Sequence, residues 1–209
     1  MRLVRPFVGL MLLVASGSAL AEAGKFSIGV WGSVVAKVES TTVDAQNGVN
    51  VDFASGWGEA LTLGYGFSRV IEGEVAISDL RSTGRFDVYG TKAVDLGKLE
   101  MRPVSAMLKV HPLCPGLVDI WVGAGGAWVW ISDLSSADLS TAGIGRVTVK
   151  SRAAFVAALG ADFQIAPHVR LGLEGRYLPL KADSHGVSGT NQELTLNPIV
   201  VSAGFRFSL

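Results

Sequence analysis

Residues 199–209 read Ile-Val-Val-Ser-Ala-Gly-Phe-Arg-Phe-Ser-Leu and alternate regularly in polarity. Its odd positions are all apolar, while its even positions are mostly small, polar or charged. Side chains alternate between the two faces of a β-strand, so one face here is wholly apolar. A soluble domain would have to cover that face and the open edge beside it. A strand that closes a membrane barrel instead faces lipid and pairs with the first strand. The stretch therefore predicts a transmembrane β-barrel.

The first residues have the features of a secretory signal peptide. Arg2 and Arg5 give a positive start, a short apolar run follows, and Ala19-Leu20-Ala21 fits an A-x-A cleavage site. The apolar run is too short to cross a membrane as a helix. We therefore predict a signal peptide over residues 1–21 and an outer-membrane barrel over residues 22–209.

Composition agrees with a secreted barrel. The chain contains 26 Gly, and its apolar residues are scattered in alternation instead of forming long runs. Cleavage would remove two of the 18 basic residues and none of the 18 acidic ones, which leaves a net charge of −2. Nucleic acid is not expected as a partner, because it needs a basic face. The single cysteine, Cys114, cannot form an internal disulfide and is interpreted as a turn residue.

Alternation of apolar and polar residues extends along the rest of the chain and predicts eight strands. They cover residues 25–38, 57–67, 70–77, 102–111, 118–131, 149–164, 169–180 and 199–209. The connections alternate between short (67–70, 111–117, 165–168) and long (38–56, 78–100, 132–148, 181–195). Short turns on the periplasmic side and long loops outside the cell are typical of outer-membrane barrels. The predicted fold is thus all-β, an eight-stranded antiparallel transmembrane β-barrel in the cell outer membrane.

A secreted β-sandwich or a lipocalin-like barrel would also alternate. Two observations favour the membrane barrel. Charges on the polar face are too sparse for a surface in water. Aromatic residues also gather near both ends of the strands, as in interfacial girdles. They are Trp57, Trp128 and Trp130 beside long loops, and Phe26, Tyr65, Phe67, Phe163 and Phe205 beside short turns. Because residues 118–131 are apolar on both faces, Trp128 and Trp130 either face lipid in this girdle or line the lumen.

Four segments carry a family resemblance. They are Leu61–Phe67 followed by Ile71–Val75, Val122–Trp128, Arg176–Leu180, and Asn197-Pro198 with Val200 and Gly204. In this order and spacing, the chain resembles the OmpW family of small outer-membrane barrels over most of its mature length. The resemblance implies a narrow, largely hydrophobic interior and a route for small apolar molecules. Family members also serve as receptors for toxins or phage.

The last strand carries a further expectation about a partner. Gly204, Phe207 and Leu209 resemble the C-terminal signal that the barrel-assembly machinery reads. The sequence departs from the family at Leu209, where a terminal Phe is usual. We expect outer-membrane lipid, this machinery and small apolar solutes as partners.

The predicted inward residues fall into two sets. A charged set toward the short turns is expected to pair internally and to plug the periplasmic half, because an unpaired buried charge is costly. It comprises Glu72, Glu74, Lys109, Asp119, Asp162, Arg170, Glu174 and Arg206. An apolar set toward the long loops is expected either to line a ligand path or simply to fill the lumen. It comprises Trp31, Val35, Val156, Leu178, Leu180 and Val200.

A plugged periplasmic half favours sideways exit between strands. Pro179 and Pro198 remove ladder donors in the last two strands, so they either weaken pairing there or mark strand ends. A structural, adhesive or receptor barrel with a sealed lumen is the alternative function.

An enzyme, by contrast, would need a serine with a positioned base. None of His111, His168 and His185 provides this pattern, so no catalytic residue is expected. No cofactor is expected, and no metal-ligand spacing is present.

Overall fold

The computed structural model describes residues 24–37, 41–44, 49–88, 91–112, 117–132, 148–149, 151–185 and 192–209. The predicted signal peptide and Cys114 lie outside these residues. The strands are β1 (Phe26–Lys37), β2 (Thr41–Asp44), β3 (Val49–Phe53), β4 (Gly56–Gly66), β5 (Ile71–Val88), β6 (Thr91–Val110), β7 (Val118–Ile131), β8 (Thr148–Val149), β9 (Arg152–Ala166), β10 (Val169–Tyr177), β11 (Lys181–His185), β12 (Gln192–Thr195) and β13 (Ile199–Ser208). Among the described residues, no helix is long and apolar enough to cross a membrane.

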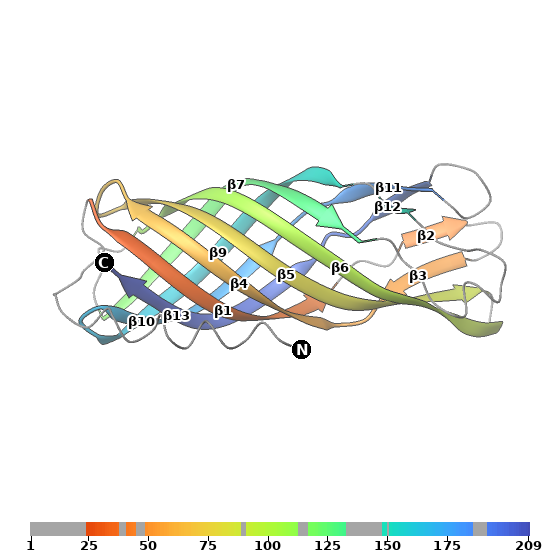
Figure 1. Cartoon of the computed structure of the whole chain (residues 1–209), viewed down its shortest axis with the longest axis horizontal. Helices are drawn as coiled ribbons and strands as arrows, with labels where there is room; N and C mark the ends of the chain where they lie inside the picture. Colours follow the sequence, from red (N-terminus) through yellow and green to blue (C-terminus); the bar gives the residue numbers. More distant parts are fainter. Residues whose placement is uncertain are drawn as a thin grey trace.

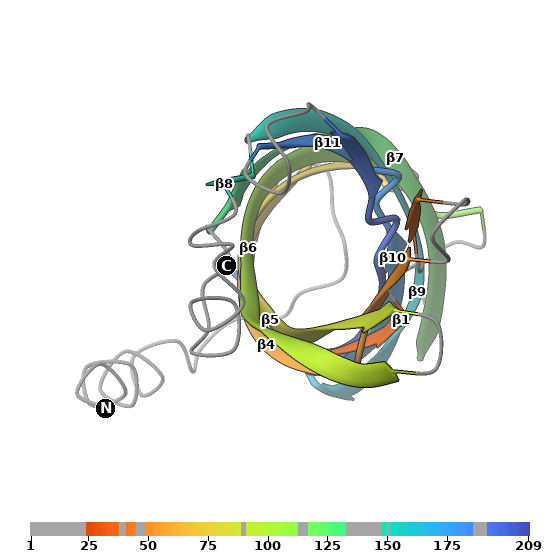
Figure 2. The ribbon, with the colours of Figure 1, turned by 90° about the vertical axis from the view of Figure 1, so that its right-hand side faces the viewer.

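Eight of these strands form a closed antiparallel barrel in the order β1-β4-β5-β6-β7-β9-β10-β13 (Figures 1 and 2). The ring closes where β13 pairs with β1, for example at Phe205 opposite Val30. Closure leaves no open edge in the barrel, which is what the alternation in residues 199–209 predicts. The eight-stranded barrel is thus confirmed.

The strand registers fix the tilt of the barrel. Starting at Trp128 on β7, we step from each residue to its partner on the next strand until the path returns to β7. It returns at Val118, ten residues from the start, so the shear of the barrel is ten residues. Ten residues at about 3.3 Å each, tilted by about 40°, span about 25 Å along the axis, the height of the apolar band of an outer-membrane barrel. The outward residues of β7 from Val118 to Trp128 are exposed or half-buried and apolar.

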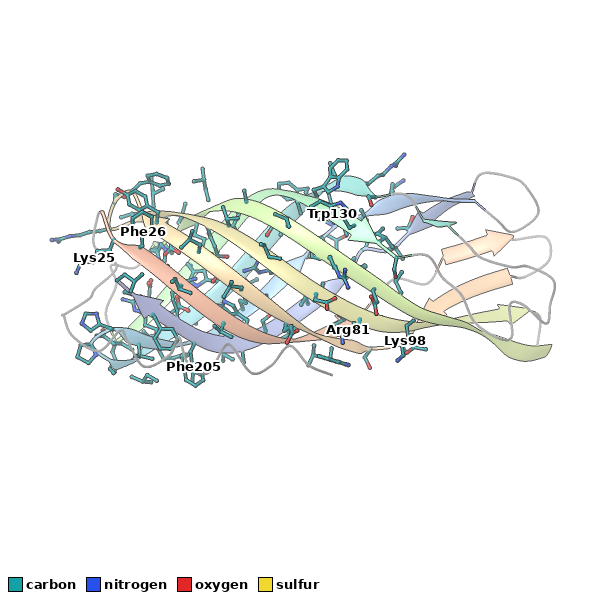
Figure 3. The ribbon with its side chains drawn as sticks, in the orientation of Figure 1. Lys25, Phe26, Arg81, Lys98, Trp130 and Phe205 are labelled. Carbon is teal, nitrogen blue, oxygen red and sulfur yellow. The ribbon has the colours of Figure 1, made fainter. Side chains whose placement is uncertain are left out.

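Aromatic side chains mark the two edges of this apolar belt (Figure 3). Phe26 and Phe205 point outward at the end with the short turns and the C-terminus. Trp57, Trp128 and Trp130 point outward at the other end, with between 47% and 57% of their surface exposed. The orientation of β7 is therefore settled, with its two terminal tryptophans facing lipid.

Two strands are longer than the sequence pattern predicts. The expected strands at 70–77 and 102–111, with a loop over 78–100, were too short, because β5 runs to Val88 and β6 starts at Thr91. Beyond the belt both strands leave the membrane, and charged residues such as Asp79 and Glu100 occupy their outward positions. The lipid-facing pattern therefore stops, although strand pairing continues.

Strand pairing also occurs within the other long connections. β2 and β3 lie in the connection after β1, β8 lies before β9, and β11 and β12 lie between β10 and β13. They gather with the extended β5–β6 hairpin at the end of the barrel opposite the short turns (Figure 1).

Candidate functional site in the barrel lumen

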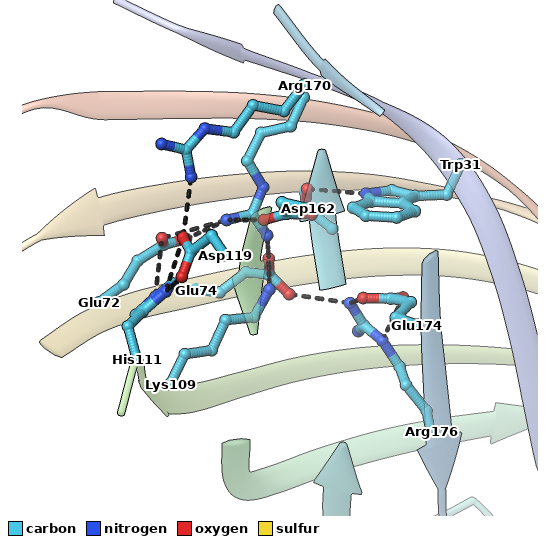
Figure 4. Close-up of polar contacts among 12 residues, drawn as sticks. Trp31, Glu72, Glu74, Lys109, His111, Asp119, Asp162, Arg170, Glu174 and Arg176 are labelled. Atoms are coloured by element: carbon cyan, nitrogen blue, oxygen red, sulfur yellow. Dashed lines mark hydrogen bonds and ion pairs between the residues drawn. The ribbon is translucent and has the colours of Figure 1, made fainter. Parts of the chain in front are cut away.

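A network of charged side chains crosses the half of the lumen next to the short turns (Figure 4). All eight residues predicted for the charge plug are buried there, none more than 7% exposed. They come from β5, β6, β7, β9, β10 and β13, and each lies at an inward position of its strand. Because side chains alternate between the two faces of a strand, the charged side chains of six strands point into the lumen.

Arg206 is the centre of this network. Its guanidinium donates to both carboxylate oxygens of Glu72 at 3.0 and 3.1 Å and to Glu74 at 3.1 Å. Asp162 lies 3.4 Å from the same guanidinium, and Lys109 donates to Glu74. Since β13 and β5 are separated by β1 and β4, these contacts span the lumen.

A second bridge crosses the full width of the barrel. Arg176 on β10 donates to Glu174 on its own strand at 2.7 Å and to Glu74 on β5 at 2.8 Å. β10 and β5 are four strands apart in either direction round the ring. Ion pairs therefore cross the lumen at this level, and an apolar solute passing straight through would have to separate them.

A third part of the network lies nearest the short turns. Arg170 donates to Asp119 at 2.8 Å, and the His111 ring contacts the same carboxylate through Nδ1 at 3.0 Å. His111 lies one residue beyond β6. Its Nε2 lies 3.5 Å from Glu72, so the ring stands between two carboxylates of the network.

His111 and Arg176 belong to this network although neither was predicted to. Both lie at polar positions of predicted strands, but neither was included in the charged set. The alternation itself places both inward, since 109 and 111 share one parity, as do 174 and 176. With them, the buried network holds five carboxyl groups and five basic groups.

Two tryptophans fill the lumen between the ion pairs. Trp31 donates from Nε1 to Thr62 at 3.1 Å. A Cβ added at Gly172 would overlap the ring of Trp31, so this glycine provides the space for the ring. Trp121 lies against Gly160 in the same way, and the Lys109 ammonium lies 3.8 Å from the centre of its ring.

Toward the long loops the lumen becomes apolar. Five of the six residues predicted for the apolar set are buried in one cluster, and Trp31 lies lower, within the charged half. The cluster reaches down to Trp121 beside Lys109. It comprises Val35, Leu80, Leu99, Met101, Met107, Trp121, Ala127, Val129, Ile131, Val156, Ala158, Leu178, Leu180, Leu196 and Val200. Leu80, Leu99 and Met101 were missed because they lie in or beside the unrecognised strand extensions. That a solute touches these residues stays a prediction.

The barrel wall has two breaks beside this apolar half. The β9–β10 ladder ends at Tyr177 opposite Ala157, and residues 153–156 and 178–180 do not continue it. On β5 and β6, the pairing skips from Ile77–Val104 to Leu80–Met101, where Pro103 has no N–H to donate.

The seam between β10 and β13, where Pro179 and Pro198 were expected to weaken pairing, is bridged. Leu178 N–H donates to the Pro198 carbonyl at 3.2 Å, and Leu196 N–H donates to the Leu180 carbonyl at 2.9 Å. The Asn197 side chain accepts from Leu180 N–H at 3.0 Å.

Comparison with known proteins places the chain in a family. The model of the OmpW family matches residues 22–209. The chain belongs to the OmpW family. This confirms the resemblance drawn from the four segments, and the location in the cell outer membrane with it. A search of curated proteins finds no match.

Solved structures similar to this OmpW-family protein are outer-membrane barrels. The outer membrane protein OprG from Pseudomonas aeruginosa superposes with a TM-score of 0.78 at 18% identity, covering 90% of this chain and 97% of that one. AlkL in lipid bilayers gives 0.66 at 18% identity, covering 93% and 94%. Neisserial surface protein A gives 0.58 at 14% identity, covering 92% and 99%. At these identities the likeness establishes the fold.

The charged half of this OmpW-family lumen has no evident metal chemistry. Among the residues that the structure describes, no three His, Cys, Asp or Glu side chains gather in a way that could hold a metal ion. The carboxylates of the network face basic groups instead.

Proposed function

We propose that the protein admits small apolar molecules from outside the cell into the apolar half of its lumen and releases them sideways into the membrane. One observation carries this proposal: a buried apolar cluster in the loop-side half of the barrel sits directly above a cross-lumen ion network. Membership of the OmpW family agrees with it, since the resemblance implies routes for small apolar molecules.

The two halves of the lumen differ in what they can accept. Each methylene group that leaves water for an apolar lining gains about 0.8 kcal/mol. Below Val200 and Leu178, the same solute would displace Arg176 from Glu174 and Glu74, and a buried charge left without its partner costs about 3–5 kcal/mol. A solute that enters from outside is therefore favoured above the network and opposed within it.

Sideways release needs a weak place in the wall beside the apolar half. The unpaired stretch between β9 and β10 lies there, because Val156, Leu178 and Leu180 flank it and all three belong to the apolar cluster. No ladder hydrogen bonds need to break where residues 153–156 pass Pro179, and the Arg152 guanidinium donates to the Lys181 carbonyl at 3.1 Å beside this stretch. We therefore place the exit on the β9 side of Pro179, not between β10 and β13. The shorter break at Pro103 is the second candidate.

Liposome uptake of an apolar solute tests the function. Leu180→Arg introduces a charge into the apolar half, so we expect uptake to fall to that of protein-free liposomes. Thr83→Arg is the matched control, because it adds the same group at an exposed position of β5. Equal uptake by Leu180→Arg and the wild type would argue against the apolar route. Wild-type uptake no faster than protein-free liposomes would favour the sealed structural or receptor barrel.

In this proposal the protein is not an enzyme. His111, which is buried in the lumen, contacts Asp119 and Glu72 and has a structural role in the plug.

A further inference from the structure

A cluster of charged side chains lies on the outer face of the barrel at the loop-side edge of the apolar belt. We name it the rim cluster; it comprises Glu59 on β4, Asp79 and Arg81 on β5, and Lys98, Glu100 and Arg102 on β6. Glu59, Asp79 and Arg102 are the next outward residues after Leu61, Ile77 and Val104, and Trp57 lies beyond Glu59 on β4. Arg81 and Lys98 mark this edge in Figure 3.

Among the described residues, the rim cluster gathers six charges on three neighbouring strands. On the other side of the barrel, the exposed Lys181 continues the outward parity of Tyr177. On the other five strands the outward positions just below this edge are apolar or aromatic, and at least 41% exposed. They are Val34 on β1, Trp128 on β7, Phe155 on β9, Tyr177 on β10 and Ile199 on β13. Six charges gathered on three neighbouring strands, at the level where lipid headgroups begin, indicate a local ligand.

The arginines of the cluster are held only weakly by the protein. Arg81 contacts Asp79 at 2.6 Å, and Arg102 lies 3.7 Å from Asp79 and 3.6 Å from Glu100. The side chain of Arg102 is 63% exposed and that of Arg81 37% exposed. Ion pairs this exposed contribute little to stability, so both guanidinium groups remain available to a stronger anion. The Arg81 Nε, enclosed by its neighbours, has no hydrogen-bond partner.

Aromatic rings flank the two arginines. Arg81 lies opposite Trp57 in the β4–β5 register and 4.8 Å from the centre of the indole ring. Arg102 lies opposite Trp130 in the β6–β7 register. Flat rings beside guanidinium groups, with carboxylates between them, suit a ligand that carries sugar rings, hydroxyl donors and phosphate.

We propose that the rim cluster binds the phosphorylated sugar headgroup of lipid A in the outer leaflet, with Arg81 and Arg102 on phosphate. A guanidinium matches phosphate with two parallel hydrogen bonds. The carboxylates of Asp79 and Glu100 accept from the sugar hydroxyls. The lipid-facing column below the cluster, formed by Leu61, Ile77 and Val104, takes the acyl chains. Leu61, Ile77 and Val104 face the hydrocarbon of the bilayer, where a water-soluble partner cannot bind. The ligand of the rim cluster is therefore a lipid.

Native mass spectrometry of the refolded full chain in detergent tests this proposal. The probes are bisphosphorylated lipid A, the same lipid without its phosphates, and phosphatidylglycerol. We expect the wild type to retain bisphosphorylated lipid A, and Arg81→Gln/Arg102→Gln to bind it at least about tenfold more weakly, because hydrogen bonds to a charged group are lost. Arg69→Gln, at the exposed turn on the opposite end, is the matched control and should bind like the wild type.

Two outcomes would overturn the proposal. One is equal binding of bisphosphorylated lipid A by the wild type and the double variant. The other is binding of dephosphorylated lipid A or phosphatidylglycerol as tightly as the bisphosphorylated form. Heat-modifiable gel mobility confirms that each variant is folded, and Arg81→Lys/Arg102→Lys, which keeps the charge but loses the planar fork, should bind with intermediate affinity. Solute uptake plays no part in this measurement, so its result is independent of the proposed transport.

Discussion

Removal of Arg206 tests whether the cross-lumen network stabilises the barrel. Arg206 donates to two carboxylates, Glu72 and Glu74, at 3.0–3.1 Å, and only 3% of its surface is exposed. A hydrogen bond to a charged group contributes about 1.5–3 kcal/mol, and removing one partner of a buried pair costs about 3–5 kcal/mol. We therefore expect Arg206→Met to lower the free energy of unfolding by about 4 kcal/mol.

Urea unfolding in phospholipid vesicles, followed by tryptophan fluorescence, measures this change. Arg69→Met is the control, because an exposed turn residue should change the free energy by no more than about 0.5 kcal/mol. Glu72→Met/Arg206→Met should cost less than the sum of its single variants, since the second substitution removes a charge that the first left unpaired. A loss below about 1 kcal/mol for Arg206→Met would refute the assigned role of the network.

Two further predictions concern the tryptophan packing and the exit. Gly172→Ala places a methyl group against the Trp31 ring, so it should destabilise the barrel by about 1–3 kcal/mol. Gly175→Ala on the same strand, where a Cβ meets nothing within 4 Å, should not, and equal urea midpoints would contradict the packing of Trp31. In a Cys114→Ser background, a disulfide between Ala157→Cys and Tyr177→Cys, the last pair of the β9–β10 ladder beside the break, should slow uptake of an apolar solute until it is reduced. A disulfide between Ala161→Cys and Leu173→Cys, within the intact ladder, should not. Unchanged uptake with the first cross-link would exclude the β9–β10 exit and leave the break at Pro103.

Strand alternation could predict which way a side chain faces but not what it contacts. The parity of Glu72, Glu74 and Arg206 along their strands is a local property, and it placed all three inward. Their partnership is not local, because 134 residues separate Glu72 from Arg206. The same limit explains Arg176, whose bridge to Glu74 depends on β5 and β10 standing on opposite sides of the ring.

The sequence pattern also failed to predict the strand extensions that lie outside the membrane, where no lipid contacts the outward side chains. Residues 78–100 were predicted as a loop, yet they continue β5 and β6 as a paired hairpin. Outside the membrane both faces can carry charge, so the period of two disappears from the sequence. The loop-side apolar cluster was therefore only half predicted, since Leu80, Leu99 and Met101 belong to that hairpin.

Alternation along the chain was enough to predict the eight-stranded barrel, most of its two aromatic edges, and the separation of charged from apolar inward residues. Each of these depends on whether a side chain meets lipid, water or the lumen, and that is a property of one residue and its strand. The ion-pair partners, the facing of β7, the space that glycines leave for Trp31 and Trp121, and the gaps in strand pairing became known from the three-dimensional arrangement. These features depend on the shear of ten residues, which determines which side chains lie opposite each other across the lumen. The shear is a property of the whole ring of strands and cannot be read from any one strand.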